Sequence, residues 1–388
     1  MRFKVAMAMA AAALCAAVVS CSSGPAATAS TQAPPVTVLT KGADNGNGDI
    51  FLAPQGGGQY GTGPEIVSIT GKVLWFHRLP AGTFATDFRT QTYLGKPVLT
   101  WFQGSNGGEG VIYNARYQQI ATVKPANGYA PDFHEFLITP WNTALILADK
   151  PGTANLTSLG LSAHQQVVVG VVQEIDIKTG KLLFQWVSSD HVPYSDSHAP
   201  MPQPGQPWDW FHINAVHLDT DGNLLISSRF TWTIYKVNLH TGAMMWQLGG
   251  KHSTFALKAA PGQKLDSAGE IFAFQHDPEA LGGNVYTVFD DESDGQSTLY
   301  SSSRAVTISL DLASDTATLI QSVNQPEGLT AGATGSAQTT KNGDLFVSWG
   351  GLSYFSEFSP SGKLLFNAKL PNGVATYRAY RLPWNPGR

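Results

Sequence analysis

A repeated β-hairpin phrase runs through the sequence and constrains the fold more than any other feature. Each copy is a β-rich run, a polar turn that often holds glycine, and a second β-rich run with an aromatic residue. A glycine in the turn supplies the positive φ that tight hairpins need. Six copies share one register, namely EIVSITGKVLWFH (65–77), VIYNARYQQIATV (111–123), EIDIKTGKLLFQWV (174–187), KVNLHTGAMMWQL (236–248), TISLDLASDTATLIQSV (307–323) and SEFSPSGKLLFNAKL (356–370).

A second pattern lies between these hairpins, in which a pair of strands ends in an apolar run. It recurs in NGDIFLAPQ, KPVLTWFQG, HEFLITPWNTALILA, FHINAVHLDTDGNLLISSRF, FQHDPEALGGNVYTVFDD and GSAQTTKNGDLFVSWGG. Two strands plus two strands per unit, repeated around a ring, are typical of a β-propeller, which hides its sheet edges by radial repetition. A decorated β-sandwich is the alternative, but ~350 residues of regularly spaced hairpins exceed the usual ~200 to 250 for such a domain.

The sequence therefore predicts one all-β domain over residues 37–388, a six-bladed β-propeller with its active site in the central channel. The strand near residues 47–54 is expected to join the last blade and close the ring. The chain has 388 residues, of which 43 % are hydrophobic and 13 % charged, and this composition excludes a disordered polyelectrolyte. With 24 basic against 28 acidic residues and no basic run, nucleic acid is not an expected partner.

The N-terminus has the pattern of a bacterial export signal. Arg2 and Lys4 precede an uncharged run over residues 5–19, which is too short to span a bilayer comfortably. The run ends in Val-Val-Ser before Cys21, and this order resembles a lipobox, in which the cysteine receives a lipid and becomes the new N-terminus. We therefore expect a lipoprotein-type signal peptide over residues 1–20. An ordinary cleavage site with an incidental cysteine is the alternative.

Lipidation of Cys21 predicts an extracytoplasmic lipoprotein of the cell envelope, whose only membrane contact is its lipid anchor. Residues 21–36 carry no charge and are rich in Ser, Pro, Ala and Thr, which predicts a flexible tether. Because Cys15 would leave with the signal, the mature chain would keep one cysteine and form no internal disulfide.

Three histidines occupy the same phase in successive repeat units: His134 in PDFHEFLI, His212 in DWFHINAV and His276 in FAFQHDPEAL. The innermost strands of a propeller line its channel, so residues at one phase of these strands converge near the axis. Arg229 ends the strand that follows His212 and is expected to face the same cavity. Three structural histidines that hold blade loops together are the alternative interpretation.

A guanidinium and three imidazoles favour binding of a tetrahedral anion. Arginine offers a fork of donors that matches sulfuryl, phosphoryl or carboxylate oxygens. A neutral imidazole is also a nucleophile if its other nitrogen is oriented by a carboxylate. A zinc site is disfavoured because Arg229 would lie beside the dication. Four carboxylates lie close enough in sequence to orient the rings, namely Asp132, Glu135, Asp209 and Asp277.

The residues around these histidines resemble a known family. DWFHINAV, LLISSR, KVNLHTGAMMWQLGG, FQHDPEAL and VYTVFDD resemble the PAPS-independent arylsulfate sulfotransferases, with the strongest likeness over residues 208–291 and in the lipoprotein-like bacterial branch. The resemblance implies transfer of a sulfuryl group from an aryl sulfate donor to a phenolic acceptor. It implies a ping-pong route through a sulfohistidine, with no metal or other cofactor.

Carried over by position, the resemblance implies that His276 is the nucleophile. His212 and Arg229 would bind the sulfuryl oxygens, and His134 would be a further binding or proton-transfer group. Asn214 and Trp210, in the D-W/F-x-H-x-N stretch, are expected substrate-binding or supporting residues.

Two other functions remain open at this stage. One is a propeller without catalytic activity that binds aromatic or sulfated ligands, or an envelope partner. The other is an aryl sulfate hydrolase, in which water replaces the phenol. The remaining histidines, among them His217, are expected to be structural or on the surface. The run Asp290-Asp291-Glu292 fits a calcium site, but a solvated turn is the preferred interpretation.

Overall fold

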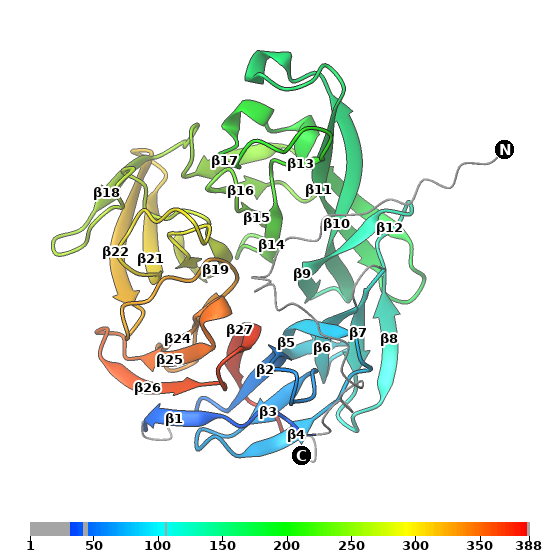
Figure 1. The fold of residues 1–388 in the computed structure, drawn as a ribbon, viewed down its shortest axis with the longest axis vertical. Helices are drawn as coiled ribbons and strands as arrows, with labels where there is room; N and C mark the ends of the chain where they lie inside the picture. Colours follow the sequence, from blue (N-terminus) through cyan, green and yellow to red (C-terminus); the bar gives the residue numbers. More distant parts are fainter. Residues whose placement is uncertain (1–31, 42–45, 105–106, 386–388) are drawn as a thin grey trace, which may run out of the picture.

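The strands in this computed structural model form six sheets, and the model describes residues 32–41, 46–104 and 107–385. Figure 1 shows these sheets arranged around a central axis, so the predicted six-bladed β-propeller is confirmed. Short 3-10 helices are present at Thr157–Leu159, Ser188–Asp190, Tyr194–Asp196 and Gly350–Leu352. Among the described residues, no helix is long and apolar enough to cross a membrane.

The first three blades, each given from its innermost strand outward, are as follows. The first blade consists of β27 (Val374–Leu382), β2 (Asp49–Gly56), β3 (Glu65–Val67) and β4 (Val73–Phe76). The second consists of β5 (Phe84–Tyr93), β6 (Lys96–Gly104), β7 (Glu109–Tyr113) and β8 (Gln119–Val123). The third consists of β9 (Ala130–Ile138), β10 (Thr143–Ala154), β11 (Gln165–Asp176) and β12 (Leu182–Val187), with β13 (Trp208–Asp209) pairing with β11.

The other three blades have the same order. The fourth consists of β14 (Ile213–Leu218), β15 (Leu224–Ser228), β16 (Thr233–Val237) and β17 (Met244–Leu248). The fifth consists of β19 (His276–Gly282), β20 (Val285–Asp290), β21 (Arg304–Asp311), β22 (Thr316–Asn324) and the parallel outer strand β18 (Ala256–Ala259). The sixth consists of β23 (Ser336–Thr339), β24 (Leu345–Ser348), β25 (Tyr354–Phe358), β26 (Leu364–Lys369) and β1 (Thr37–Thr40).

The six hairpin copies in the sequence supply the third and fourth strand of every blade. In the copy over residues 174–187, for example, β11 and β12 pair antiparallel around the turn that holds Gly180, which has φ of 70°. The innermost strands β27, β5, β9, β14, β19 and β23 contact one another in succession around the axis. Repetition of one hairpin unit therefore brings six strand starts together at the centre.

Both ends of the chain contribute to closing the ring. β2 pairs antiparallel with the C-terminal strand β27, with Phe51 opposite Tyr380. β1 adds to the outer edge of the sixth blade through β26. The expected closure by the strand near residues 47–54 therefore involves pairing with β27, while β1 is the N-terminal strand that enters the last blade.

The core lies between neighbouring blades. Trp186 and Val187 of the third blade, for example, belong to the same buried apolar cluster as Val216 and Tyr235 of the fourth. Fully burying one large apolar side chain stabilises a fold by roughly 1.5–3 kcal/mol. Packing between blades thus stabilises the domain, as we expect for a chain predicted to form no internal disulfide.

The predicted signal peptide and Cys21 lie outside the described residues. Of the expected tether, residues 32–36 are described, and they lie against the domain. The backbone oxygen of Gln32 accepts a hydrogen bond from the backbone N–H of Gly61 at 2.9 Å, and Pro34 is buried. The described part of the chain therefore contacts the domain before Thr37.

Candidate active site

Three histidines that are distant in sequence lie on neighbouring innermost strands. His134 belongs to β9 and His276 is the first residue of β19, while His212 immediately precedes β14. The ring centroid of His134 lies 5.1 Å from that of His212 and 6.3 Å from that of His276. The structure thus brings together the three imidazoles whose shared repeat phase suggested convergence.

In each of these three rings, the Nδ1 atom is hydrogen-bonded to an aspartate. The pairs are His134 with Asp132 at 2.7 Å, His212 with Asp209 at 2.5 Å, and His276 with Asp291 at 2.6 Å. A carboxylate at Nδ1 accepts the ring proton and leaves the lone pair on Nε2 of the neutral ring. In the described part of the chain, none of the three Nε2 atoms has a hydrogen-bond partner.

Burial keeps at least two of the rings neutral. It lowers the pKa of His276 well below the ordinary value of 6.5, and the nearby Arg229 lowers it further. Burial also lowers the pKa of His134, and this effect outweighs the opposing effect of Asp132. Neutral imidazoles with oriented rings can act as nucleophiles or proton acceptors at pH 7.

Arg229 supplies a buried cationic donor. It directly follows β15, and its Nη2 atom donates to the backbone oxygen of Gly332 at 2.7 Å. The guanidinium lies 5.6 Å from the ring centroid of Phe230 and 5.4 Å from that of Phe274. Its Nη1 atom is buried and lacks a hydrogen-bond partner among the described residues. Because arginine stays protonated in proteins, this N–H group is available to an anion.

The backbone at His212 has an uncommon conformation that the neighbouring strand holds in place. His212 has φ of 51°, in the left-handed region that non-glycine residues seldom adopt. Its carbonyl oxygen accepts a hydrogen bond from the N–H of Arg229 at 3.0 Å. The oxygen of Phe211 accepts one from the Ser228 hydroxyl at 2.5 Å. These contacts also fix Arg229 relative to the His212 ring.

His134 and His212 have aromatic neighbours. One of these neighbours, Tyr377 of β27, was not among the candidate residues from the sequence. Its hydroxyl is buried without a hydrogen-bond partner among the described residues, and its ring centroid lies 5.7 Å from that of His134. Burial raises the pKa of this phenol, so it stays protonated. Phe133 stacks on His134 at 4.2 Å, and Phe230 meets His212 edge-on at 5.1 Å.

Two of the expected substrate-binding residues have other surroundings. Trp210 is 0 % exposed and packs against Tyr194 at 4.5 Å, which fits the supporting role and not direct contact with substrate. Asn214 is also buried, and its side-chain amide donates to the backbone oxygen of Gln275 at 2.7 Å. Asn214 therefore ties β14 to the residue that precedes His276.

The acidic run Asp290-Asp291-Glu292 is neither a solvated turn nor an open calcium site. All three residues are 0 % exposed. The Arg304 guanidinium pairs with Asp290 at 2.7 Å and with Glu292, while Asp291 turns to His276. Asp291 is therefore the orienting carboxylate that the sequence analysis missed. Its signal was its position in VYTVFDD, on the strand that pairs with β19.

A second cluster of charged groups lies on the same strands. Its members are Asp87 and Arg89 of β5, Glu135 of β9, His217 of β14, Asp277 of β19 and Arg378 of β27, and we call them the ion-pair cluster. The pairs are Arg378 with Glu135 at 2.8 Å, with Asp277 at 3.2 Å and with Asp87 at 3.3 Å, and Arg89 with Asp87 at 2.8 Å and with Glu135. Strand irregularities at Thr86–Arg89 and His276–Glu279 accompany left-handed residues at Asp87 and Asp277, and such bulges re-aim side chains.

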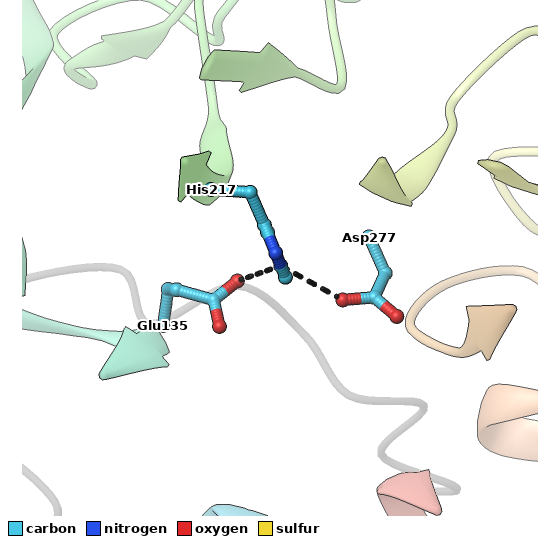
Figure 2. A group of neighbouring side chains, drawn as sticks. All are labelled: Glu135, His217 and Asp277. Carbon is cyan, nitrogen blue, oxygen red and sulfur yellow. Dashed lines mark ion pairs between the residues drawn. The ribbon is translucent and has the colours of Figure 1, made fainter. Parts of the chain in front are cut away.

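The sequence analysis expected Glu135 and Asp277 to orient the three histidines. In the structure they do not. Figure 2 shows both carboxylates pointing at the Nε2 atom of His217, at 3.3 and 3.2 Å. Burial opposes ionisation of Asp277, but Arg378 and His217 outweigh this effect and hold the pKa of its carboxyl below the usual range. The side chains of the ion-pair cluster are thus joined by salt bridges between neighbouring innermost strands.

The ligand atoms of Glu135, His217 and Asp277 lie within 4.8 Å of one another, a spacing compatible with a metal ion. The same carboxylate oxygens, however, pair with Arg378 Nη1 at 2.8 and 3.2 Å. A dication there would lie against a buried guanidinium, which is electrostatically costly. The residues therefore do not fit a metal site.

A cavity of about 590 Å³ borders the ion-pair cluster. Its lining includes Arg89, Glu279, Gln338 and Tyr380, but none of His134, His212 and His276. The candidate active site is therefore assigned from the converging imidazoles and the unpartnered donor of Arg229 rather than from this cavity.

Comparisons with known proteins support both the fold and the family. The model of the arylsulfotransferase (ASST) family matches residues 89–370. A search of curated proteins finds no significant match. A protein of unknown function from Bacteroides caccae is similar in structure, with 13 % identity, a TM-score of 0.51, and coverage of 86 % of this chain and 99 % of its own.

Periplasmic gluconolactonase from Pseudomonas aeruginosa has 13 % identity and a TM-score of 0.45, with 87 % of this chain and 99 % of that chain covered. At 13 % identity, the similarity to the Bacteroides caccae protein speaks to fold alone. The family model, by contrast, spans all three histidines, their aspartates and Arg229. It supports arylsulfotransferase function in general terms. By this match over most of its length, the chain belongs to the arylsulfotransferase family.

Proposed function

We propose that this protein transfers a sulfuryl group from an aryl sulfate to a phenolic acceptor through a covalent intermediate on His276. The observation that carries the proposal is the convergence of three aspartate-bonded imidazoles beside a buried arginine with an unpartnered N–H. Family membership supports the same chemistry.

His276 fits the role of nucleophile best. Its Nδ1 atom is held by Asp291 at 2.6 Å, and its lowered pKa keeps Nε2 unprotonated. In the first step Nε2 attacks sulfur, an N–S bond forms, and the bond between sulfur and the aryl oxygen breaks. In the second step the phenolic oxygen of the acceptor attacks sulfur, and the N–S bond breaks. The acceptor proton replaces the one taken up by the departing phenoxide.

Arg229 and His212 fit the binding of the non-bridging oxygens. By analogy with phosphoryl transfer, charge is spread over these oxygens in a loose transition state, so positioned donors matter most. Arg229 offers its unpartnered Nη1, and its N–H bond to the His212 carbonyl fixes the two groups relative to each other. The His212 ring lies in the same site, with its centroid 5.1 Å from that of His134.

Proton transfer to and from the phenolic oxygens falls to His134 and Tyr377. His134 is neutral and paired with Asp132, as expected of a group that accepts the acceptor's proton. The Tyr377 hydroxyl is protonated and lacks a partner among the described residues, so it can donate its proton to the departing oxygen, and His134 later returns the acceptor's proton to the Tyr377 oxygen. Phe133 and Phe230, which flank His134 and His212, offer apolar faces to the aryl groups.

Steady-state turnover of a chromogenic aryl sulfate, with and without a phenol, tests the proposal. We expect release of the coloured phenol that depends on acceptor concentration, with parallel lines in double-reciprocal plots. His276→Gln, whose amide can still donate to Asp291, should be inactive. Turnover that ignores the phenol would indicate a hydrolase, and saturable binding without turnover would indicate a binding protein. Either result would refute the proposal.

We also propose that lipidation at Cys21 anchors the domain outside the cytoplasm. The support is the order of charged, apolar and small residues before Cys21. Metabolic labelling with a fatty acid, followed by fractionation, should find label and protein in the membrane fraction. Cys21→Ala should lose both. Labelling or membrane retention unaffected by this substitution would contradict lipidation at that residue.

A further inference from the structure

One guanidinium contacts all three strands on which the histidines are placed. Arg378 Nη1 pairs with Glu135 of β9 at 2.8 Å and with Asp277 of β19 at 3.2 Å. Arg378 Nη2 donates to the backbone oxygen of Asn214 in β14 at 3.1 Å. The side chain is fully buried, so these contacts are made away from water.

Each contacted residue is adjacent or nearly adjacent to a histidine of the site. Glu135 follows His134 in the chain and Asp277 follows His276. Asn214 lies two residues after His212, and its amide in turn holds the carbonyl of Gln275, the residue before His276. A displacement of Arg378 would therefore shift the backbone next to all three histidines.

We propose that Arg378 is a positioning residue that aligns His134, His212 and His276, so that insertion of the C-terminal strand β27 completes the site. The inference rests on the proposed function, because the alignment matters for sulfuryl transfer. Arg378 itself does not act on substrate. Its neighbour Tyr377 enters the site on the same strand, which makes closure of the ring and assembly of the site one event.

The choice of arginine has a physical reason. Its planar guanidinium holds several acceptors in fixed directions, whereas the lysine ammonium is a point charge on a flexible stem. A misplacement of about 1 Å among reacting groups can lower turnover by about a hundredfold. The charge of Arg378 also lowers the pKa of His276 and of His134, which helps to keep both rings neutral.

A pair of substitutions in β27 tests the proposal. Arg378→Lys keeps the charge but loses the planar fork. Arg381→Lys is the matched control, since Arg381 is equally buried in the same strand and pairs with Glu357, away from the histidines. For each variant, kcat and KM are measured on folded protein, with circular dichroism as the check on folding. Histidine ring signals are recorded by NMR without substrate.

We expect Arg378→Lys to lower kcat by roughly tenfold to a hundredfold with KM changed less than about threefold. Ring signals of His134, His212 and His276 should shift together. Arg381→Lys should leave kcat and these signals as in the wild type. Wild-type kcat and ring signals in folded Arg378→Lys would overturn the proposal, as would equal effects of both substitutions.

A milder variant covers the case in which Arg378→Lys fails to fold. Asp277→Asn keeps the size of the side chain and weakens its pairing with Arg378 and with His217, so it should shift the His276 and His134 signals. Unchanged signals there would also overturn the proposal. The NMR readout is independent of turnover, so it still tests alignment if the wild type transfers no sulfuryl group and the proposed function alone fails.

Discussion

His134, His212, His276 and Arg229, which we call the imidazole cluster, lie next to the ion-pair cluster. The two clusters differ in how their polar atoms are paired. In the ion-pair cluster, carboxylates of Asp87, Glu135 and Asp277 face Arg89, Arg378 and His217 at short range. In the imidazole cluster, each ring is hydrogen-bonded through Nδ1 to one aspartate. Arg229 Nη1 is buried without a hydrogen-bond partner among the described residues.

This difference indicates that the ion-pair cluster serves the stability of the fold and that the imidazole cluster is suited to binding a ligand. Buried charges of opposite sign that pair with one another hold strands together. Buried donors and acceptors without partners cost stability, and a protein retains them where a ligand completes the pairing. Removing a carboxylate of the ion-pair cluster should therefore lower stability, Arg378→Lys should misalign the rings, and substitutions in the imidazole cluster should act mainly on turnover.

The largest expected effect is that of His276→Gln. We expect phenol-dependent turnover to fall by at least about a thousandfold, because the nucleophile is lost. The urea midpoint should stay close to that of the wild type, since the glutamine amide can still donate to Asp291. A variant that retains more than a tenth of wild-type turnover would place the nucleophile elsewhere.

Glu135→Gln should show the opposite pattern. Removing this charge leaves Arg89 and Arg378 buried with too few carboxylates, and breaking such buried pairs costs about 3–5 kcal/mol. Urea denaturation should show this as a lower midpoint. If the midpoint is unchanged while turnover is lost, the ion-pair cluster is part of the reaction, and the comparison above fails.

Arg229→Met should lower kcat/KM for the aryl sulfate by about a hundredfold, the usual effect of removing one transition-state donor. Methionine keeps much of the volume between Phe230 and Phe274. Stability should change less than in Glu135→Gln. An unaltered kcat/KM would mean that the unpartnered Nη1 atom is not used to bind the sulfuryl group.

The smallest predicted effect is on the pH profile. Because the pKa of His276 is lowered, its neutral form persists below pH 6.5, and the acid limb of kcat/KM should have its midpoint below that value. Arg229→Met removes a positive charge that opposes protonation, so the midpoint should rise. A downward shift in the variant would contradict this assignment.

Much of the fold could be predicted from the sequence because propellers repeat. Hairpin copies such as residues 174–187 and 236–248 share turn and aromatic positions, and each became the outer half of a blade. The phase of His134, His212 and His276 within the repeat predicted their convergence, since strands at one phase start at one end of the axis.

The partners of these residues could not be predicted in the same way. Asp132 and Asp209 lie within three positions of their histidines, whereas Asp291 is fifteen residues from His276 and reaches it across a strand pair. Local sequence also could not show that Glu135 and Asp277 turn to Arg378, because that residue arrives from the other end of the chain.

Intact-mass analysis after brief exposure to an aryl sulfate, with no phenol present, tests the central assignment most directly. We predict one added sulfuryl group, located on His276 by peptide mapping and removed when a phenol is added. Turnover without any retained group, or a group retained on a residue other than His276, would contradict the account.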